Sequence, residues 1–245
     1  MRLDETPASP GRSAMAPRAI GKGRFAAALF DMDGLLIDSE RAIMAAWLDA
    51  ARALGRPLTP DSYAAVVGRD ATASDRLLAE TMGGMDVVRA AREHADRLLS
   101  GRPPALRFPL KAGAATLLRR LASLGVPCAL ASSSARDEIE ARLHAVGVRD
   151  CFRAVAGGDE VAAGKPDPAV YRLAAERAGL RPDTCLAFED SPNGARAALA
   201  SGAALVLVPD LVTPPADLAA RSLHVLGSLD EAVPLAAGWF GGLAI

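Results

Sequence analysis

The chain has 245 residues, of which 51% are hydrophobic and 23% charged, and its formal net charge is −1 with acids and bases interspersed. This length allows one large domain or a core with one insertion, and the composition is typical of a globular protein rather than a disordered or fibrous one. We expect no nucleic-acid partner, because no basic stripe is present, and no membrane contact, because no apolar run approaches the roughly 18 residues that span a bilayer.

The chain opens with a segment without periodicity, followed by the first predicted strand. Residues 1–23 mix Pro, Gly, Ser and charged residues, and we expect a disordered leader, with Met1 and Met15 both open as the start of translation. Residues 25–30 form a short apolar run that Asp31 closes. Such a run is typical of a fully buried strand.

Residues 39–109 are predicted to be an all-helical insertion, or cap, placed directly after this strand. Four helical patterns follow one another without a convincing strand, at residues 40–54, 61–67, 71–82 and 87–99. We therefore expect residues 24–38 and 110–245 to form the core around the cap.

Strands and helices alternate in the remainder of the chain. Strands are predicted at residues 127–131, 154–156, 184–188 and 204–208, and helices at 112–124, 136–146, 168–178 and 192–200. A glycine follows each of these helices closely, as is common at helix C-termini. This alternation predicts an α/β fold with a doubly wound parallel sheet that helices cover on both faces.

Ligands of doubly wound sheets bind beyond the carboxyl ends of the strands, where this chain places acidic residues twice. The first pair, Asp31 and Asp33, is followed by Gly34, which lets backbone approach a ligand closely. The second pair is Glu189 and Asp190. Each pair has an ordinary alternative interpretation, an acidic turn for the first and a charged helix start for the second.

Two further strand ends carry groups suited to an anion. Hydroxyls occur at Ser132, Ser133 and Ser134, and Lys165 lies in the loop ahead of the helix at 168–178. The alternatives are plain N-capping by Ser133 or Ser134 and a solvated surface lysine. Taken together, four acids that would repel one another, one lysine and a hydroxyl cluster favour bound Mg²⁺ and a substrate phosphate.

These motifs resemble those of the haloacid dehalogenase superfamily, in its subgroup of β-phosphoglucomutase-like sugar phosphatases. The matching segments are Asp31-Met32-Asp33-Gly34, Asp38-Ser39-Glu40, the strand end at Ser132, Gly164-Lys165-Pro166-Asp167-Pro168 and Glu189-Asp190-Ser191-Pro192-Asn193-Gly194. The resemblance covers nearly the whole chain from Phe25 onward. It implies a phosphoric monoester hydrolase with a Rossmann-like core and a helical cap.

The resemblance also implies residue roles. Asp31 would be the nucleophile that forms an aspartyl-phosphate, and Asp33 the general acid and base. Mg²⁺ would be held by the Asp31 carboxylate, the Asp33 backbone carbonyl and Asp190, with Glu189 nearby. Ser132, Lys165 and backbone amides near Gly34 would hold the phosphoryl oxygens.

Other residues receive structural interpretations. Trp47 and Tyr63 are expected in the core of the cap, and Arg69 after Gly68 is a candidate substrate contact or a solvated turn residue. Cys128, Cys151 and His144 receive no chemical role. Cys128, Cys151 and Cys185 predict neither a disulfide framework nor a zinc site, which favours a reducing cytoplasm.

The sequence distinguishes a hydrolase from three rival functions. A mutase of the β-phosphoglucomutase type would carry a histidine twelve residues after the nucleophile, where this chain has Ile43. Asp33 argues against a dehalogenase, and the complete set of core residues argues against a non-catalytic module. We expect a small phosphorylated metabolite as the partner, with hexose or pentose phosphates favoured, and a monomer or weak dimer.

Overall fold

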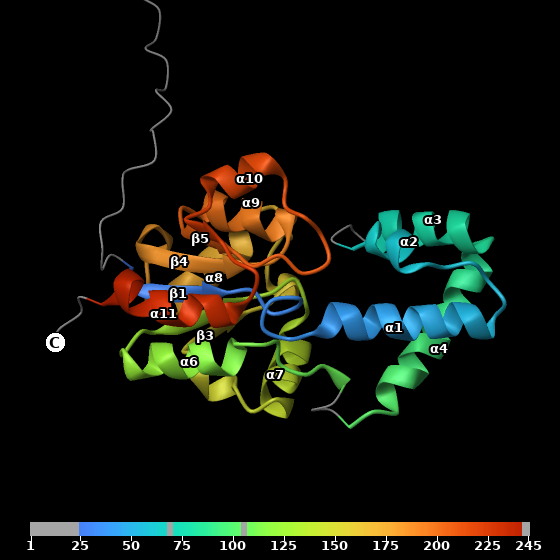
Figure 1. Cartoon of the computed structure of the whole chain (residues 1–245), viewed down its shortest axis with the longest axis horizontal. Coiled ribbons are helices and arrows are strands. Elements are labelled where there is room, and N and C mark those ends of the chain that lie inside the picture. Colours follow the sequence, from blue (N-terminus) through green and yellow to red (C-terminus); the bar gives the residue numbers. More distant parts are fainter. Residues whose placement is uncertain (1–24, 68–70, 104–106, 242–245) are drawn as a thin grey trace, which may run out of the picture.

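A computed structural model describes residues 25–67, 71–103 and 107–241, and within them one parallel sheet of six strands organises the chain (Figure 1). The spatial order is β3-β2-β1-β4-β5-β6. The strands are β1 (Ala27–Phe30), β2 (Cys128–Ala131), β3 (Ala154–Ala156), β4 (Cys185–Glu189), β5 (Ala204–Leu207) and β6 (His224–Val225). The prediction of a doubly wound α/β fold is confirmed. The expected leader and the Gly68-Arg69 turn lie outside the described residues.

Helices cover both faces of the sheet. One face carries α6 (Ala114–Ser123), α7 (Arg136–Ala145) and α11 (Leu229–Phe240); the other carries α8 (Ala169–Arg177), α9 (Pro192–Ser201) and α10 (Ala216–Arg221). Figure 1 shows α9 and α10 on one side of the sheet and α6 and α7 on the other. Alternate residues of β1 point to opposite faces, so Ala28 and Phe30 join the first apolar cluster while Ala27 and Leu29 join the second. Phe30 stacks on Phe188 of β4, with ring centroids 4.8 Å apart.

The inserted helices form an apolar cluster of their own. They are α1 (Ser39–Ala53), α2 (Pro60–Ala64), α3 (Ala71–Met82) and α4 (Met85–Ser100). Trp47 and Tyr63 are buried in this cluster, as expected, and Ile43 packs against it. Figure 1 shows the insertion projecting from one end of the sheet.

The chain leaves the core and returns to it at adjacent points. Ile37, ahead of α1, and Leu110, on the returning segment, form an antiparallel bridge. Asp38 N donates to Pro109 O over 2.8 Å, and Lys111 N donates to Leu36 O over the same distance. The two connections are therefore joined by backbone hydrogen bonds. Within the described residues, no helix is long and apolar enough to cross a membrane.

Candidate active site

The carboxyl ends of the neighbouring strands β2, β1 and β4 bring the predicted residues together. Asp31 follows β1, Ser132 follows β2, and Glu189 ends β4. The loop between β3 and α8 supplies Lys165, whose Nζ donates to Asp31 Oδ1 over 2.5 Å and to Glu189 Oε1 over 2.6 Å. Lys165 is therefore buried between two carboxylates and is not a solvated surface lysine.

Three buried carboxylates form a compact acidic cluster. Ligand oxygens of Asp31, Glu189 and Asp190 all lie within 4.8 Å of one another. Burial raises the pKa of Asp31 to about 8; Lys165 opposes this rise, and the neighbouring carboxylates of Glu189 and Asp33 add to it. The pKa of Asp190 is likewise raised well above its ordinary value, by burial first and then by Glu189 and Asp31.

The pKa values of both partners of the ion pair between Lys165 and Asp31 are raised, that of Asp31 by its burial and in spite of Lys165. Burial alone would lower the pKa of Lys165, but the charges of Asp31 and Glu189 outweigh it and raise that pKa. One ammonium thus faces three carboxylates, which leaves the ionised cluster two positive charges short. A divalent cation with a preference for oxygen ligands fits this charge and this donor set.

Glu189 is held by more donors than the other acids of the cluster. Its Oε1 accepts from Lys165 and, over 2.9 Å, from the hydroxyl of Tyr171. Its Oε2 accepts from the backbone N–H groups of Asp190 and Ser191, both over 3.0 Å, and from Ser191 Oγ. Because these five donors occupy both oxygens, Glu189 is better suited to orient its neighbours than to bind a cation directly.

Asp33 lies beside the cluster, but its carboxylate faces other partners. Oδ1 accepts from Ser39 Oγ over 2.7 Å and from Arg142, and Oδ2 accepts from Ser134 Oγ over 2.9 Å. The carboxylate is not part of the acidic cluster.

The serines after β2 do not cap α7, so the capping interpretation is wrong. The N-cap position of α7 is Ala135, and the first N–H of this helix, that of Arg136, is bound by Asp159 Oδ1. Ser134 and buried Ser132 both donate their hydroxyls to Asp33 Oδ2, over 2.9 Å and 3.4 Å, and Ser132 Oγ also accepts from Ser134 N over 3.1 Å. Ser191, by contrast, caps α9, with its side chain accepting from Gly194 N.

Two glycines allow the chain to pass close to the acids. Gly34 has φ +83°, and a Cβ atom there would collide with Asp190. A Cβ atom at Gly194, in the first turn of α9, would collide with the carboxyl group of Glu189. Both contacts require glycine because no other residue lacks the Cβ atom.

A small cavity opens between the insertion and the core. Glu40 and Val67 line it from the insertion, and Asp190, Ser191, Pro192, Leu211 and Val212 line it from the core. Burial, helped by the charges of Asp33 and Asp210, raises the pKa of Glu40 to about 7. An acid that changes charge near neutrality thus faces the candidate site.

The residues at the strand ends could be predicted from the sequence, but the side chains that hold them in place could not. Tyr171 and Arg142 lie within helices whose spacing of apolar residues gives no sign of a role at the site. Neither residue belongs to one of the matching motifs. A buried tyrosine hydroxyl needs a partner, so the position of Tyr171 on the buried face of α8 was a usable signal. Nothing in the sequence relates Arg142 to Asp33.

A family model described as haloacid dehalogenase-like hydrolase matches residues 25–202. The phosphorylated carbohydrates phosphatase of Thermotoga maritima is 30% identical over 184 residues, which cover 72% of this chain and 81% of that protein. Hexitol phosphatase A of Escherichia coli is 32% identical over 183 residues, covering 74% and 81%. A crystal structure of a HAD family hydrolase from Deinococcus radiodurans with bound phosphate and sodium superposes with a TM-score of 0.73 at 28% identity, covering 88% and 97%.

Proposed function

Since the chain belongs to the haloacid dehalogenase-like hydrolases and is a phosphoric monoester hydrolase, we propose that it hydrolyses a small sugar phosphate through an aspartyl-phosphate on Asp31. The observation that carries this proposal is the buried contact of Asp31 with Lys165 inside an acidic cluster. A phosphate group bound against Asp31 would therefore lie beside the fixed positive charge of Lys165.

In the first half-reaction, a carboxylate oxygen of Asp31 attacks phosphorus while the bond from phosphorus to the sugar oxygen breaks. Asp33 donates its proton to that oxygen, so the sugar leaves as an alcohol. The products are an aspartyl-phosphate and an ionised Asp33. One displacement is thereby divided into two easier ones.

In the second half-reaction, Asp33 takes a proton from a water molecule, whose oxygen attacks the same phosphorus. The bond between phosphorus and Asp31 breaks, releasing inorganic phosphate and restoring the Asp31 carboxylate. Asp33 ends protonated, ready for the next ester. Both halves need Asp33 within hydrogen-bond reach of the moving proton.

The charged groups around Asp31 stabilise the phosphoryl oxygens. Lys165, Ser132 and backbone amides near Gly34 would bind them, and this electrostatic work dominates phosphoryl transfer. Asp31, Asp190 and the Asp33 backbone carbonyl would hold Mg²⁺, with Glu189 as their orienting neighbour. The cation supplies positive charge to the transferring phosphoryl group.

Two observations support a sugar phosphate as substrate. The named substrates of two relatives are phosphorylated carbohydrates and hexitol phosphates. Glu40 faces the cavity between insertion and core, where a carboxyl group can bind sugar hydroxyls.

The insertion would close over the site and exclude water. The three free cysteines agree with a reducing cytoplasm as the compartment.

The alternative is a phosphomutase of the β-phosphoglucomutase type, which Ile43 disfavours. Ile43 packs against the apolar cluster of the insertion and can neither donate nor accept a proton. Without a proton-transferring group there, water is the expected acceptor of the phosphoryl group.

The test is a screen for phosphate release over sugar phosphates, glycerol phosphates, phosphoglycolate and nucleoside monophosphates with Mg²⁺. We expect release from at least one hexose or pentose phosphate, loss of activity in EDTA and recovery with Mg²⁺ but poorly with Ca²⁺, whose looser coordination misplaces the phosphate. β-Glucose 1-phosphate with a trace of the 1,6-bisphosphate is run in parallel. Glucose 6-phosphate forming faster than inorganic phosphate would establish the mutase instead.

A further inference from the structure

The Asp33 carboxylate receives four side-chain donors from three separate parts of the chain, and the weakest of them is Ser132 Oγ, which donates to Oδ2 over 3.4 Å. Ser39 is the first residue of α1, Ser134 lies in the loop after β2, and Arg142 lies on α7. Only Arg142 brings a full charge. Its contact spans 109 residues of sequence, so the pair depends on the tertiary fold rather than on local geometry.

Arg142 is itself held from two further sides. Its guanidinium pairs with Glu138, one turn earlier on α7, and lies over the ring of Phe108 with 4.7 Å between Cζ and the ring centroid. Its side chain is 14% exposed. An arginine fixed by a carboxylate and an aromatic face loses little freedom when it binds a second carboxylate, because its planar fork is already oriented.

Phe108 places this arrangement on the returning connection between insertion and core. Its side chain packs against the first apolar cluster of the core, which includes Ala28 and Phe30, and also against the apolar cluster of the insertion. Ser39 lies at the start of the insertion on the outgoing connection. Both connections therefore reach Asp33, the outgoing one directly through Ser39 and the returning one through the contact of Phe108 with Arg142.

We propose that Arg142 is a positioning residue that fixes the carboxyl group of Asp33 for proton transfer and links that position to the returning connection through Phe108. The inference rests on the role of Asp33 in the proposed function. Arg142 touches neither Asp31 nor Lys165 in the described contacts, so its loss should spare phosphoryl transfer itself and impair only steps that move a proton.

The test separates these steps by the choice of leaving group. With 2,4-dinitrophenyl phosphate and enzyme in excess, the released phenolate needs no proton, so the single-turnover rate reports transfer to Asp31 alone. Steady-state turnover of the sugar phosphate needs Asp33 in both halves. For Arg142→Met we expect steady-state kcat to fall about tenfold, part of the effect of general acid–base catalysis, with the single-turnover rate within about twofold of wild type.

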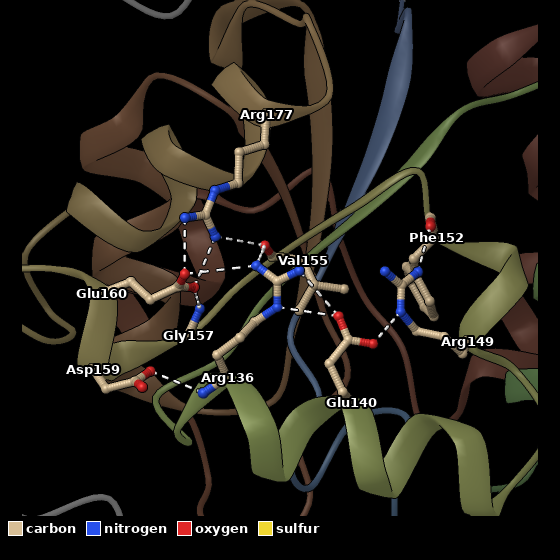
Figure 2. A network of polar contacts seen from close by, with 9 residues as sticks. All are labelled: Arg136, Glu140, Arg149, Phe152, Val155, Gly157, Asp159, Glu160 and Arg177. Atoms are coloured by element: carbon tan, nitrogen blue, oxygen red, sulfur yellow. Dashed lines mark hydrogen bonds and ion pairs between the residues drawn. The ribbon is translucent and has the colours of Figure 1, made fainter.

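Arg149→Met is the matched control. Arg149 follows α7, pairs with Glu140 and donates to Phe152 O, and its side chain is 22% exposed (Figure 2). The control thus removes a comparable arginine near the same helix without touching Asp33. Both of its rates should stay within about twofold of wild type after correction for the folded fraction.

Arg142→Lys and Phe108→Leu keep the proposal testable if Arg142→Met folds poorly. Lysine retains the charge but loses the planar fork, and leucine retains bulk but removes the ring, so each should lower steady-state kcat less than Arg142→Met and in the same direction. Equal losses in both rates for the Arg142 variants, or unchanged steady-state turnover, would overturn the inference. A wild-type enzyme that releases no phenolate and no phosphate would refute the proposed function itself.

Discussion

At the scale of single residues, the Asp31 carboxylate is the group on which most interactions of the site act. It is buried, it lies in a cluster with the carboxylates of Glu189 and Asp190, and it pairs with the ammonium of Lys165. Asp31→Asn keeps the size of the side chain but cannot accept the phosphoryl group. We expect turnover to fall to below about a hundredth of wild type, since loss of a covalent step costs several kcal/mol of barrier. Phosphate release by purified protein measures it.

Asp137→Asn, on the exposed first turn of α7, is the control for this substitution and should retain wild-type turnover. Circular dichroism and the melting temperature of both variants establish that they are folded. An Asp31→Asn enzyme with more than about a hundredth of the wild-type rate would remove Asp31 from the nucleophile role.

A second residue-scale prediction concerns the close approach of Gly194 to Glu189. Gly194→Ala adds a Cβ atom that collides with the carboxyl group, so Glu189 must move away from Lys165 and Tyr171. We expect a loss of activity of at least about tenfold and a higher Mg²⁺ requirement, measured by titrating Mg²⁺.

Gly238→Ala, also inside a helix, has open space around the added Cβ atom and should leave activity unchanged. It should also stabilise α11 slightly, because alanine favours helix over glycine by up to about 1 kcal/mol. If Gly194→Ala matched this control in activity and Mg²⁺ requirement, the orienting role of Glu189 would be wrong.

At the scale of elements, an ion-pair network joins β3, α7 and α8. Arg177 of α8 forms two bonds of 2.8 Å to the carboxylate of Glu160, and both Arg177 and Arg136 donate to Val155 O (Figure 2). The hydrogen bond from Arg177 is the largest cause lowering the pKa of Glu160 to about 2 from its ordinary 4.5. The network thereby holds the segment that follows β3 against two helices.

The sign of the pH effect follows from this shift. A carboxylate with a depressed pKa in the folded protein stabilises the fold fully above its unfolded pKa, and this contribution is lost as the pH falls from about 4.5 to about 2. We expect Glu160→Gln to lower the free energy of unfolding at pH 7 by about 2 kcal/mol, a value reduced because solvent screens this partly exposed ion pair. At pH 2.5 the loss should be much smaller. Urea denaturation at both pH values measures it.

Glu93→Gln on the exposed surface of α4 is the control, and it should change stability by less than about 0.5 kcal/mol at either pH. An equal effect of Glu160→Gln at both pH values would contradict the assigned pair with Arg177.

Elements with strong periodicity could be predicted from the sequence, and the C-terminal ones could not. The helix at residues 71–82 was predicted with the bounds that the structure gives, and the strand at 154–156 likewise. Helix α11 was missed because Pro234 and Gly238 lie inside it, and both argue against a helix. Burial of Trp239 and Phe240 on the sheet outweighs those preferences.

Strand β6 was missed for a different reason, since two residues carry no period and only pairing with β5 defines the strand. The candidate site shows the same division. Strand ends predicted the acids and Lys165, whereas Arg142 and Tyr171 become neighbours of those groups only through packing between helices and sheet.

At the scale of the whole molecule, Asp210 ties the core to both connections of the insertion. Its side chain is 1% exposed, and Oδ1 accepts from Lys111 over 2.6 Å and from Arg41 of α1 over 2.7 Å. We expect Asp210→Ala to lower the free energy of unfolding by about 2 kcal/mol, because two charged hydrogen bonds are lost. Urea denaturation measures it.

Asp49→Ala removes an exposed pair with Arg52 inside α1 and should cost less than about 1 kcal/mol. If Asp210→Ala cost no more than this control, the contact between core and insertion would be energetically unimportant.

The order of the strands also governs when the protein becomes active during its synthesis. Asp31 leaves the ribosome early, but its neighbour in the sheet on one side is β4, whose acidic end emerges more than 150 residues later. Lys165 appears shortly before that end. A nascent chain therefore carries its proposed nucleophile without the lysine or the acids that surround it in the folded protein, and at about 5 to 20 residues per second this inert interval lasts many seconds. We expect ribosome-bound chains stalled before residue 184 to release no phosphate, so activity can begin only after β4 has joined β1 in the sheet.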